Sequence, residues 1–249
     1  MNVFAISDLH LSLSVKEKSM EVFSQNWKDY QEKIKDNWQS VVSKNDLVLI
    51  AGDICWAMLL KDALIDLEWL HDLNGKKVII KGNHDYWWPS LSKLSQALPS
   101  SISALHNNSL SFDDIAIAGT RLWDCPDYNF NEFINFTFNP KENHSLEKDI
   151  QKELSDNIFQ RELIRLKLSL DQMDKTKKHK IVMTHYPPIG ADLKDSQVSK
   201  ILENHKIDIA VFGHLHNVKK NVELFGEKNN IKYILTSSDY LDFEPIKIL

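Results

Sequence analysis

Short apolar runs that each stop at a polar cluster constrain the fold of this chain most. The clearest run lies in residues 77–85, which read KVIIKGNHD. Its apolar part, residues 78–80, is β-branched throughout, which is typical of a buried parallel strand. Functional groups in open α/β sheets gather at the carboxyl ends of strands. Asn83, His84 and Asp85 therefore mark a candidate site, although a plain polar turn is the alternative interpretation.

The same arrangement recurs four more times along the chain. Apolar runs at residues 2–7, 47–51, 181–184 and 208–212 are followed by Asp8 and His10, by Asp53, by His185, and by His214 and His216, respectively. Residues i and i+2 of an extended chain point to the same side, so Asp8 and His10 can face one point beyond their strand. A single pair of this kind is also explained by a helix cap beside an incidental histidine. Five such strand ends in one chain indicate a shared site.

Amphipathic segments separate these runs. Residues 17–43 carry large apolar side chains at spacings of three and four, which predicts one long helix packed on the sheet. Residues 60–73 and 146–173 show the same period and predict two more helices. The resulting β-α-β-α-β order implies parallel strands joined by right-handed crossovers. The predicted fold class is α/β.

Length and composition limit the organisation of the chain. A chain of 249 residues with 43% hydrophobic content can bury one substantial core, so we expect a single domain over residues 1–249. The formal net charge of −5 provides no basic field for a polyanion, and strong nucleic-acid binding is not expected. Two cysteines without a CxxC pattern suit a reducing cytosol, so we expect a cytoplasmic protein. We expect neither a membrane span nor a signal peptide, because the apolar runs are too short.

Two segments outside the strand ends are candidates for substrate contacts. Arg121 follows the apolar run at residues 115–118 and could reach an anionic group by a forked contact. A structural ion pair is the alternative role for this side chain. Residues 124–145 form the least regular part of the chain and are rich in Asn, Asp and Phe. Long irregular segments in compact domains tend to be lids or binding loops, so we expect a cap or loop insertion that shapes substrate choice.

Taken in order, the motifs D-x-H at residues 8–10, GD at 52–53, GNHD at 82–85, the strand-end His185 and GHxH at 213–216 carry a family resemblance. The chain resembles the calcineurin-like metallophosphoesterase superfamily. It is similar in particular to uncharacterised bacterial phosphohydrolases that have GNHDYWW and HYPP segments. The resemblance implies a four-layer sandwich in which helices flank two mixed β-sheets.

The resemblance also implies a site. One divalent metal ion would be held by Asp8, His10, Asp53 and His216, and a second by Asp53, Asn83, His185 and His214. Carboxylate and imidazole ligands without thiolates suit Mn, Fe or Zn, and Mn is favoured. His84 would act as a catalytic residue on the phosphoryl group or the leaving oxygen, and Asp85 would fix the His84 imidazole.

The implied function is a metal-dependent phosphohydrolase. A metal-bridging hydroxide at the dinuclear site would attack a phosphomonoester or phosphodiester of a phosphorylated small molecule. Two alternatives remain open at this point: a nuclease of the same superfamily, and a non-catalytic scaffold that uses the fold to bind proteins. The filled set of ligand positions argues against the scaffold.

Overall fold

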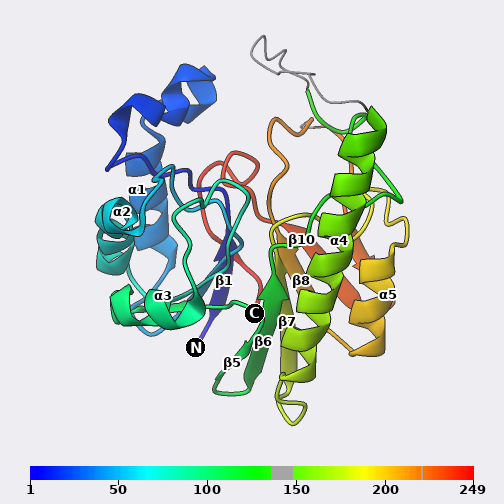
Figure 1. Ribbon diagram of the computed structural model, residues 1–249. Coiled ribbons are helices and arrows are strands. Elements are labelled where there is room, and N and C mark those ends of the chain that lie inside the picture. Colours follow the sequence, from blue (N-terminus) through cyan, green and yellow to red (C-terminus); the bar gives the residue numbers. More distant parts are fainter. Residues whose placement is uncertain (136–147, 220) are drawn as a thin grey trace.

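Two mixed β-sheets face each other in the computed structural model, which describes residues 1–135, 148–219 and 221–249 (Figure 1). The first sheet has the strand order β11-β1-β2-β3-β4. Its strands are β1 (Val3–Ile6), β2 (Leu47–Ile50), β3 (Lys76–Ile79), β4 (Ile102–Ala104) and β11 (Ile246–Lys247). Strands β1 to β4 are parallel, and β11 pairs with β1 in the antiparallel direction.

The second sheet has the order β5-β6-β7-β8-β10-β9. Its strands are β5 (Ser109–Phe112), β6 (Ile115–Thr120), β7 (His179–Thr184), β8 (Ile209–Phe212), β9 (Gly226–Lys228) and β10 (Ile231–Leu235). The four central strands are parallel, and the two edge strands β5 and β9 are antiparallel to their neighbours. Both sheets are therefore mixed, as the resemblance implied.

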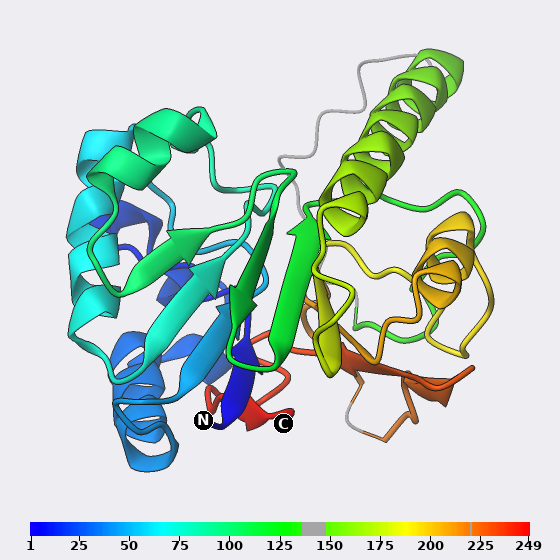
Figure 2. The same ribbon diagram turned by 90° about the horizontal axis from the view of Figure 1, so that it is seen from below.

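Helices cover the outer face of each sheet (Figure 2). Helices α1 (Tyr30–Val41), α2 (Leu60–Asp72) and α3 (Leu91–Ala97) lie on the first sheet, and α4 (Lys148–Asp171) and α5 (Gln197–Asn204) lie on the second. The molecule thus has four layers, and the predicted four-layer sandwich is confirmed. No helix among the described residues is long and apolar enough to cross a membrane.

The alternation of side chains along each strand explains the layering. In β1, Val3 and Ala5 point into the space between the sheets, whereas Phe4 and Ile6 point toward the helices. Each central strand is apolar on both sides because each side meets another layer. This is why the strands read as continuous apolar runs in the sequence.

The predicted helix over residues 17–43 is only half right. The helix α1 begins at Tyr30, and the preceding segment forms three short 3-10 turns, η1 (Lys16–Lys18), η2 (Met20–Val22) and η3 (Gln25–Trp27). Asp29 has a φ of 54°, which interrupts a right-handed helix at that point. The side chains of this segment therefore do not form one helical stripe on the sheet.

The irregular segment that we expected to be an insertion is described in part. Tyr128, Phe130 and Phe133 pack against the core of the second sheet. The remaining aromatic residues, Phe136 and Phe138, lie outside the described residues. The role of residues 124–145 as a cap on the site stays a prediction.

Candidate metal centre

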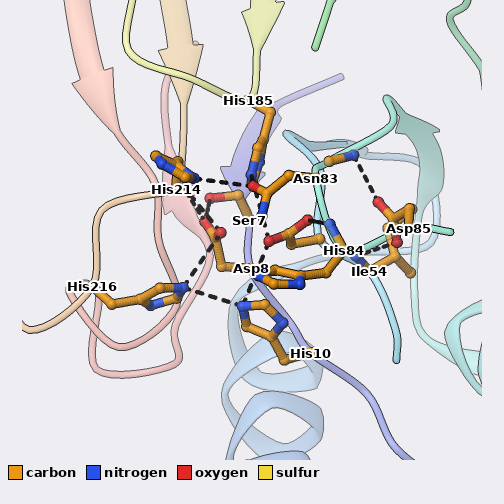
Figure 3. Close-up of polar contacts among 12 residues, drawn as sticks. Ser7, Asp8, His10, Ile54, Asn83, His84, Asp85, His185, His214 and His216 are labelled. Carbon is orange, nitrogen blue, oxygen red and sulfur yellow. Dashed lines mark hydrogen bonds and ion pairs between the residues drawn. The ribbon is translucent and has the colours of Figure 1, made fainter. Parts of the chain in front are cut away.

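The carboxyl ends of five parallel strands meet at one edge of the sandwich and bring all seven predicted metal ligands together (Figure 3). Strands β1, β2 and β3 of the first sheet are followed by Asp8 and His10, by Asp53 and by Asn83. Strands β7 and β8 of the second sheet are followed by His185 and by His214 and His216. The site is thus built from both sheets.

Three of these side chains form one group. The Nε2 atoms of His10 and His216 lie 3.1 Å apart, and Nε2 of His216 lies 3.6 Å from Oδ1 of Asp8. Their ligand atoms all lie within 4.8 Å of one another, which leaves room for one shared cation. Asp8 and His10 are almost completely buried, and Asp8 also accepts a hydrogen bond from the Ser7 hydroxyl at 2.5 Å.

Asp53 connects this group to a second one. Its Oδ2 atom lies 3.8 Å from Nε2 of His10 and 3.4 Å from Nε2 of His185. Asp8, Asp53 and His185 form a second set whose ligand atoms lie within 4.8 Å of one another. Asp53 is therefore within reach of histidines from both groups, His10 and His185.

Asn83 completes the side of the site that faces β7 and β8. Its Oδ1 atom lies 2.6 Å from Nε2 of His185 and 3.1 Å from Nδ1 of His214. An amide oxygen offers a lone pair without adding another negative charge to a site that already buries Asp8 and Asp53.

Four of the predicted ligands have a left-handed backbone conformation. Asp8, His10, Asp53 and His214 have φ angles of 56°, 47°, 52° and 73°, a region that non-glycine residues seldom adopt. Such strain clusters at functional sites and persists only where the surroundings impose it.

Two glycines allow the loops to approach the carboxylates. A Cβ atom on Gly82 would overlap the carboxylate of Asp53, and one on Gly213 would overlap that of Asp8. The close approach at Gly213 brings the main-chain N–H of His214 to Asp8, where it donates to both carboxylate oxygens at 3.0 and 3.1 Å. The glycines of the GNHD and GHxH motifs are thus steric requirements of the site.

Outer hydrogen bonds fix two of the imidazoles. Nδ1 of His185 donates to the carbonyl of Ala51 at 3.0 Å, which leaves Nε2 to face Asp53 and Asn83. Nδ1 of His216 donates to Oδ1 of Asp239 at 2.9 Å, which leaves Nε2 to face Asp8. Hydrogen bonds of this kind orient metal-binding histidines and set their tautomer.

Asp239 was not among the predicted site residues. It follows the apolar strand β10, so it lies beyond a strand end as the predicted ligands do. The signal was therefore present in the sequence, in the segment Ser237-Ser238-Asp239, but no family motif marked it.

Burial and neighbouring charges perturb the titration of the centre. Burial raises the pKa of Asp8 and lowers the pKa of His10 and His214 well below the usual range. Burial alone would also lower the pKa of His185 and His216, but the adjacent Asp53 and Asp239 raise both values to about 9. For Asp53, burial is outweighed by the charge of His185, so its pKa falls below the usual range. The lowered pKa of Asp53 keeps this carboxylate ionised among the imidazoles, which favours cation binding once the imidazoles lose their protons.

His84 lies beside the ligands but is not one of them. Its main-chain N–H donates to Oδ1 of Asp53 at 2.8 Å, and its ring centroid lies 4.5 Å from that of Trp56 and 5.6 Å from that of His10. The ring is half-buried, and burial lowers its pKa. The His84 ring therefore lies at the border of the ligand cluster, and its role in catalysis stays a prediction.

Asp85 acts on the loops and not on the His84 ring, which corrects our expectation. Among the described residues, its buried carboxylate accepts hydrogen bonds from the N–H groups of Gly82, Ile54 and Cys55 and from the Trp87 indole. Burial, with a contribution from Asp53, raises its pKa to about 7. Asp85 therefore ties the loop after β2 to the loop after β3, and so positions two ligand loops together.

Among the described residues, the Arg121 side chain makes no hydrogen bond or ion pair with the seven predicted ligands. Its guanidinium carbon lies 4.8 Å from the ring centroid of Trp123, and its Nη2 lies 3.5 Å from Oε1 of the buried Glu162. Of the two roles that the sequence left open, the structural ion pair is therefore present.

An apolar pocket of about 420 Å³ opens next to His84. Its walls are formed by His10, Met20, Phe23, Ser24, Trp27, Trp56, His84, His216 and Asn217. The Trp56 ring stacks on His10, and the Trp27 ring meets His10 and His216 edge on. The turns η2 and η3, which we had predicted to be helical, supply the outer wall of this pocket.

Comparison of the chain with known proteins identifies related families and structures. The family model described as calcineurin-like phosphoesterase matches residues 1–218. A stretch of 86 residues is 34% identical to the Gene 66 protein of Mycobacterium phage L5 and covers 34% of this chain and 40% of the phage protein. The crystal structure of a protein of unknown function from Aquifex aeolicus aligns over 99% of this chain and 95% of its own, with 15% identity and a TM-score of 0.46.

Proposed function

Because the chain belongs to the calcineurin-like phosphoesterase family, we propose that it is a metal-dependent phosphohydrolase that cleaves a phosphomonoester or phosphodiester of a small molecule. One observation carries this proposal: seven side chains from five strand ends, Asp53 among them, bring oxygen and nitrogen donors together without a cysteine. That donor set fits divalent ions such as Mn, Fe or Zn, and we favour Mn.

The ligands divide into two sets that share Asp53. Asp8, His10, Asp53 and His216 would hold one ion, and Asp53, Asn83, His185 and His214 the other. When bound, a pair of divalent ions lowers the pKa of water and neutralises the charge on phosphoryl oxygens. Ser7, Asp239 and the main chain at Ala51 hold the ligands in place through hydrogen bonds.

His84 would act on the substrate from the side of the apolar pocket. Its main chain is fixed by Asp53, and its ring packs on Trp56, so the imidazole is oriented before any substrate arrives. It would donate a proton or a hydrogen bond to an oxygen of the phosphoryl group or of the leaving group, which typically contributes about 10²–10⁴-fold.

The apolar pocket supports an apolar or aromatic organic part in the substrate. His10 and His216 of the centre and the adjacent His84 line it, so a group bound in it would lie next to a phosphoryl group held at the centre. Phe23 lines the pocket and is 67% exposed, so its ring is accessible to a group that enters from solvent.

The central test is phosphoester hydrolysis by the manganese-loaded protein. We expect turnover of p-nitrophenyl phosphate or bis(p-nitrophenyl) phosphate, and we expect Asp53→Ala to lose both turnover and bound metal. Asp36→Asn is the control, because Asp36 is an exposed aspartate on α1 outside the site. Equal turnover by wild type and Asp53→Ala would contradict the proposal.

A second experiment tests the substrate class. Phe23→Ser should raise the KM for an aryl phosphate and leave the KM for glycerol phosphate unchanged. Val22→Ser is the matched control, because Val22 is 75% exposed and does not line the pocket. The same effect of both substitutions on both substrates would exclude the pocket as the site of the organic group.

A further inference from the structure

A second cavity, of about 260 Å³, has a very different lining from the apolar pocket. It is lined by Lys81, Leu105, His106, Asn107, Thr120, Arg121, Arg161, Glu162 and Arg165. Four of these side chains are cationic and one is anionic, which leaves an excess of three positive charges. The protein as a whole has a net charge of −5, so this local excess stands out against the rest of the chain.

The single carboxylate does not neutralise the cations around it. Oε1 of the buried Glu162 lies 2.7 Å from Nη1 of Arg165, but 3.5 Å from Nη2 of Arg121 and 3.7 Å from Nε of Arg161. Only the contact with Arg165 has the length of a strong hydrogen bond. Oε2 of Glu162 is occupied by the Thr120 hydroxyl at 3.0 Å. The cavity therefore contains many more donors than acceptors.

Lys81 adds to this imbalance. Its side chain is half-buried and makes no hydrogen bond or ion pair within the part of the chain that the structure describes. Its ammonium group and the Arg121 guanidinium line the same cavity, so two cations share one small space. An acceptor in the cavity would offset the repulsion between them.

His106 presents a further donor. The Trp88 indole can only donate, and it donates to Nδ1 of His106 at 3.0 Å. The neutral ring therefore carries its proton on Nε2.

We propose that this cavity is a binding site for a phosphate-type oxyanion, either a free ion or a phosphoryl group of a larger ligand. Lys81, Arg121 and Arg161 would supply charge, and the planar guanidinium groups suit the paired oxygens of a phosphate. A tetrahedral dianion replaces the acceptors that the lining lacks, and it offsets most of the excess charge.

The main chain connects the cavity to the candidate metal centre. The carbonyl of Arg121 accepts hydrogen bonds from the N–H groups of His185 and Tyr186, each at 3.0 Å. Lys81 immediately precedes Gly82 and Asn83. An anion in the cavity would therefore bind beside two of the loops that carry metal ligands, without using those ligands.

Sulfate binding tests the site, because sulfate has the geometry and charge of phosphate and is not hydrolysed. Wild type should bind sulfate in calorimetry, and its Tm should rise with sulfate concentration. Lys81→Met and Arg161→Gln should each weaken that binding at least tenfold. Lys167→Met is the matched control, because Lys167 is an exposed cation on α4 outside the cavity. Asp53→Asn should still bind sulfate in the cavity, so failure of the metal centre can be told apart from failure of this proposal.

The Tm without sulfate separates a ligand site from a structural ion cluster. Lys81→Met should keep or raise the Tm in the absence of anions, since it removes a desolvated charge beside Arg121. A lower Tm for Lys81→Met, with sulfate binding equal to that of wild type, would overturn the proposal, as would the absence of sulfate binding to wild type.

A comparison of glucose 6-phosphate with glucose 1,6-bisphosphate identifies the source of the anion. A bisphosphate that binds wild type at least tenfold more tightly, with this advantage lost in Lys81→Met, assigns the cavity to a second phosphoryl group of one ligand. Equal binding of the two compounds, beside sulfate binding that depends on Lys81, assigns it to a free ion.

Discussion

Nδ1 of His216 lies 2.9 Å from Oδ1 of Asp239, and the other oxygen of Asp239 accepts the N–H of Asn217 at 3.0 Å. One buried carboxylate thus fixes both the ring and the main chain of the last ligand loop. The loop after β10 therefore belongs to the candidate centre, although it supplies no ligand.

Substitution of Asp239 by Asn should weaken metal retention by about 10- to 100-fold, because the His216 imidazole loses its anionic partner. The metal content after dialysis against chelators of increasing strength measures this effect. Asp36→Asn should retain metal like wild type. Unchanged retention in Asp239→Asn would show that the hydrogen bond does not support the ligand.

His84→Ala should leave the metal content unchanged and lower kcat by about 10²–10⁴-fold, as expected for the loss of a positioned proton or hydrogen-bond donor. Elemental analysis and turnover should be measured on the same sample. His205→Ala is the control, because His205 is a histidine outside the site that bonds to its own helix α5. Loss of the metals in His84→Ala would instead make His84 a ligand.

Gly82→Ala should remove bound metal and lower the Tm, since the added methyl group would occupy the position of the Asp53 carboxylate. Metal analysis and thermal unfolding of the purified variant check both effects. A variant with normal metal content and normal Tm would show that the GNHD loop can move away from Asp53 without consequence.

The buried Lys77 side chain should make the protein more stable as pH rises. Its side chain is 1% exposed, and burial lowers its pKa to about 8 from an ordinary value of 10.5. Between these two values the unfolded chain binds a proton that the folded chain has released, so the free energy of unfolding increases as pH rises. The slope attributable to this group is at most about 1.4 kcal/mol per pH unit.

Urea unfolding at a series of pH values between 8 and 10 measures this slope. Lys77→Met should remove the contribution, and Lys76→Met, which changes an exposed neighbour, should keep it. The same slope in wild type and in Lys77→Met would contradict the assignment.

The strand ends were predictable because their physical cause is local. A buried parallel strand needs an apolar run, and a residue such as Asp53 or His185 immediately after that run is visible in the sequence. The convergence of the predicted ligands follows from the shared direction of the strands. The partner of His216, Asp239, shows the limit of this reasoning, because its strand end has no motif to distinguish it from a turn.

The two-sheet arrangement came from the family resemblance and not from the residues themselves. Apolar runs do not state which strands are neighbours, and the edge strands β4 and β9 have three residues each. The helix predicted from residue 17 failed for a related reason. Met20 and Trp27 are apolar at helical spacing, but they line a pocket beside His10 and His216. A periodic sequence pattern cannot distinguish residues that line a pocket from one face of a helix.

The hydrogen bonds from the His214 N–H to Asp8 join a loop of the second sheet to a carboxylate of the first. Neither sheet supplies all of the predicted ligands. The centre can therefore form only when the two sheets have packed together correctly. A chain in which they dock wrongly would keep most of its strands and still be unable to capture a cation, which makes metal uptake a sensitive check of correct folding.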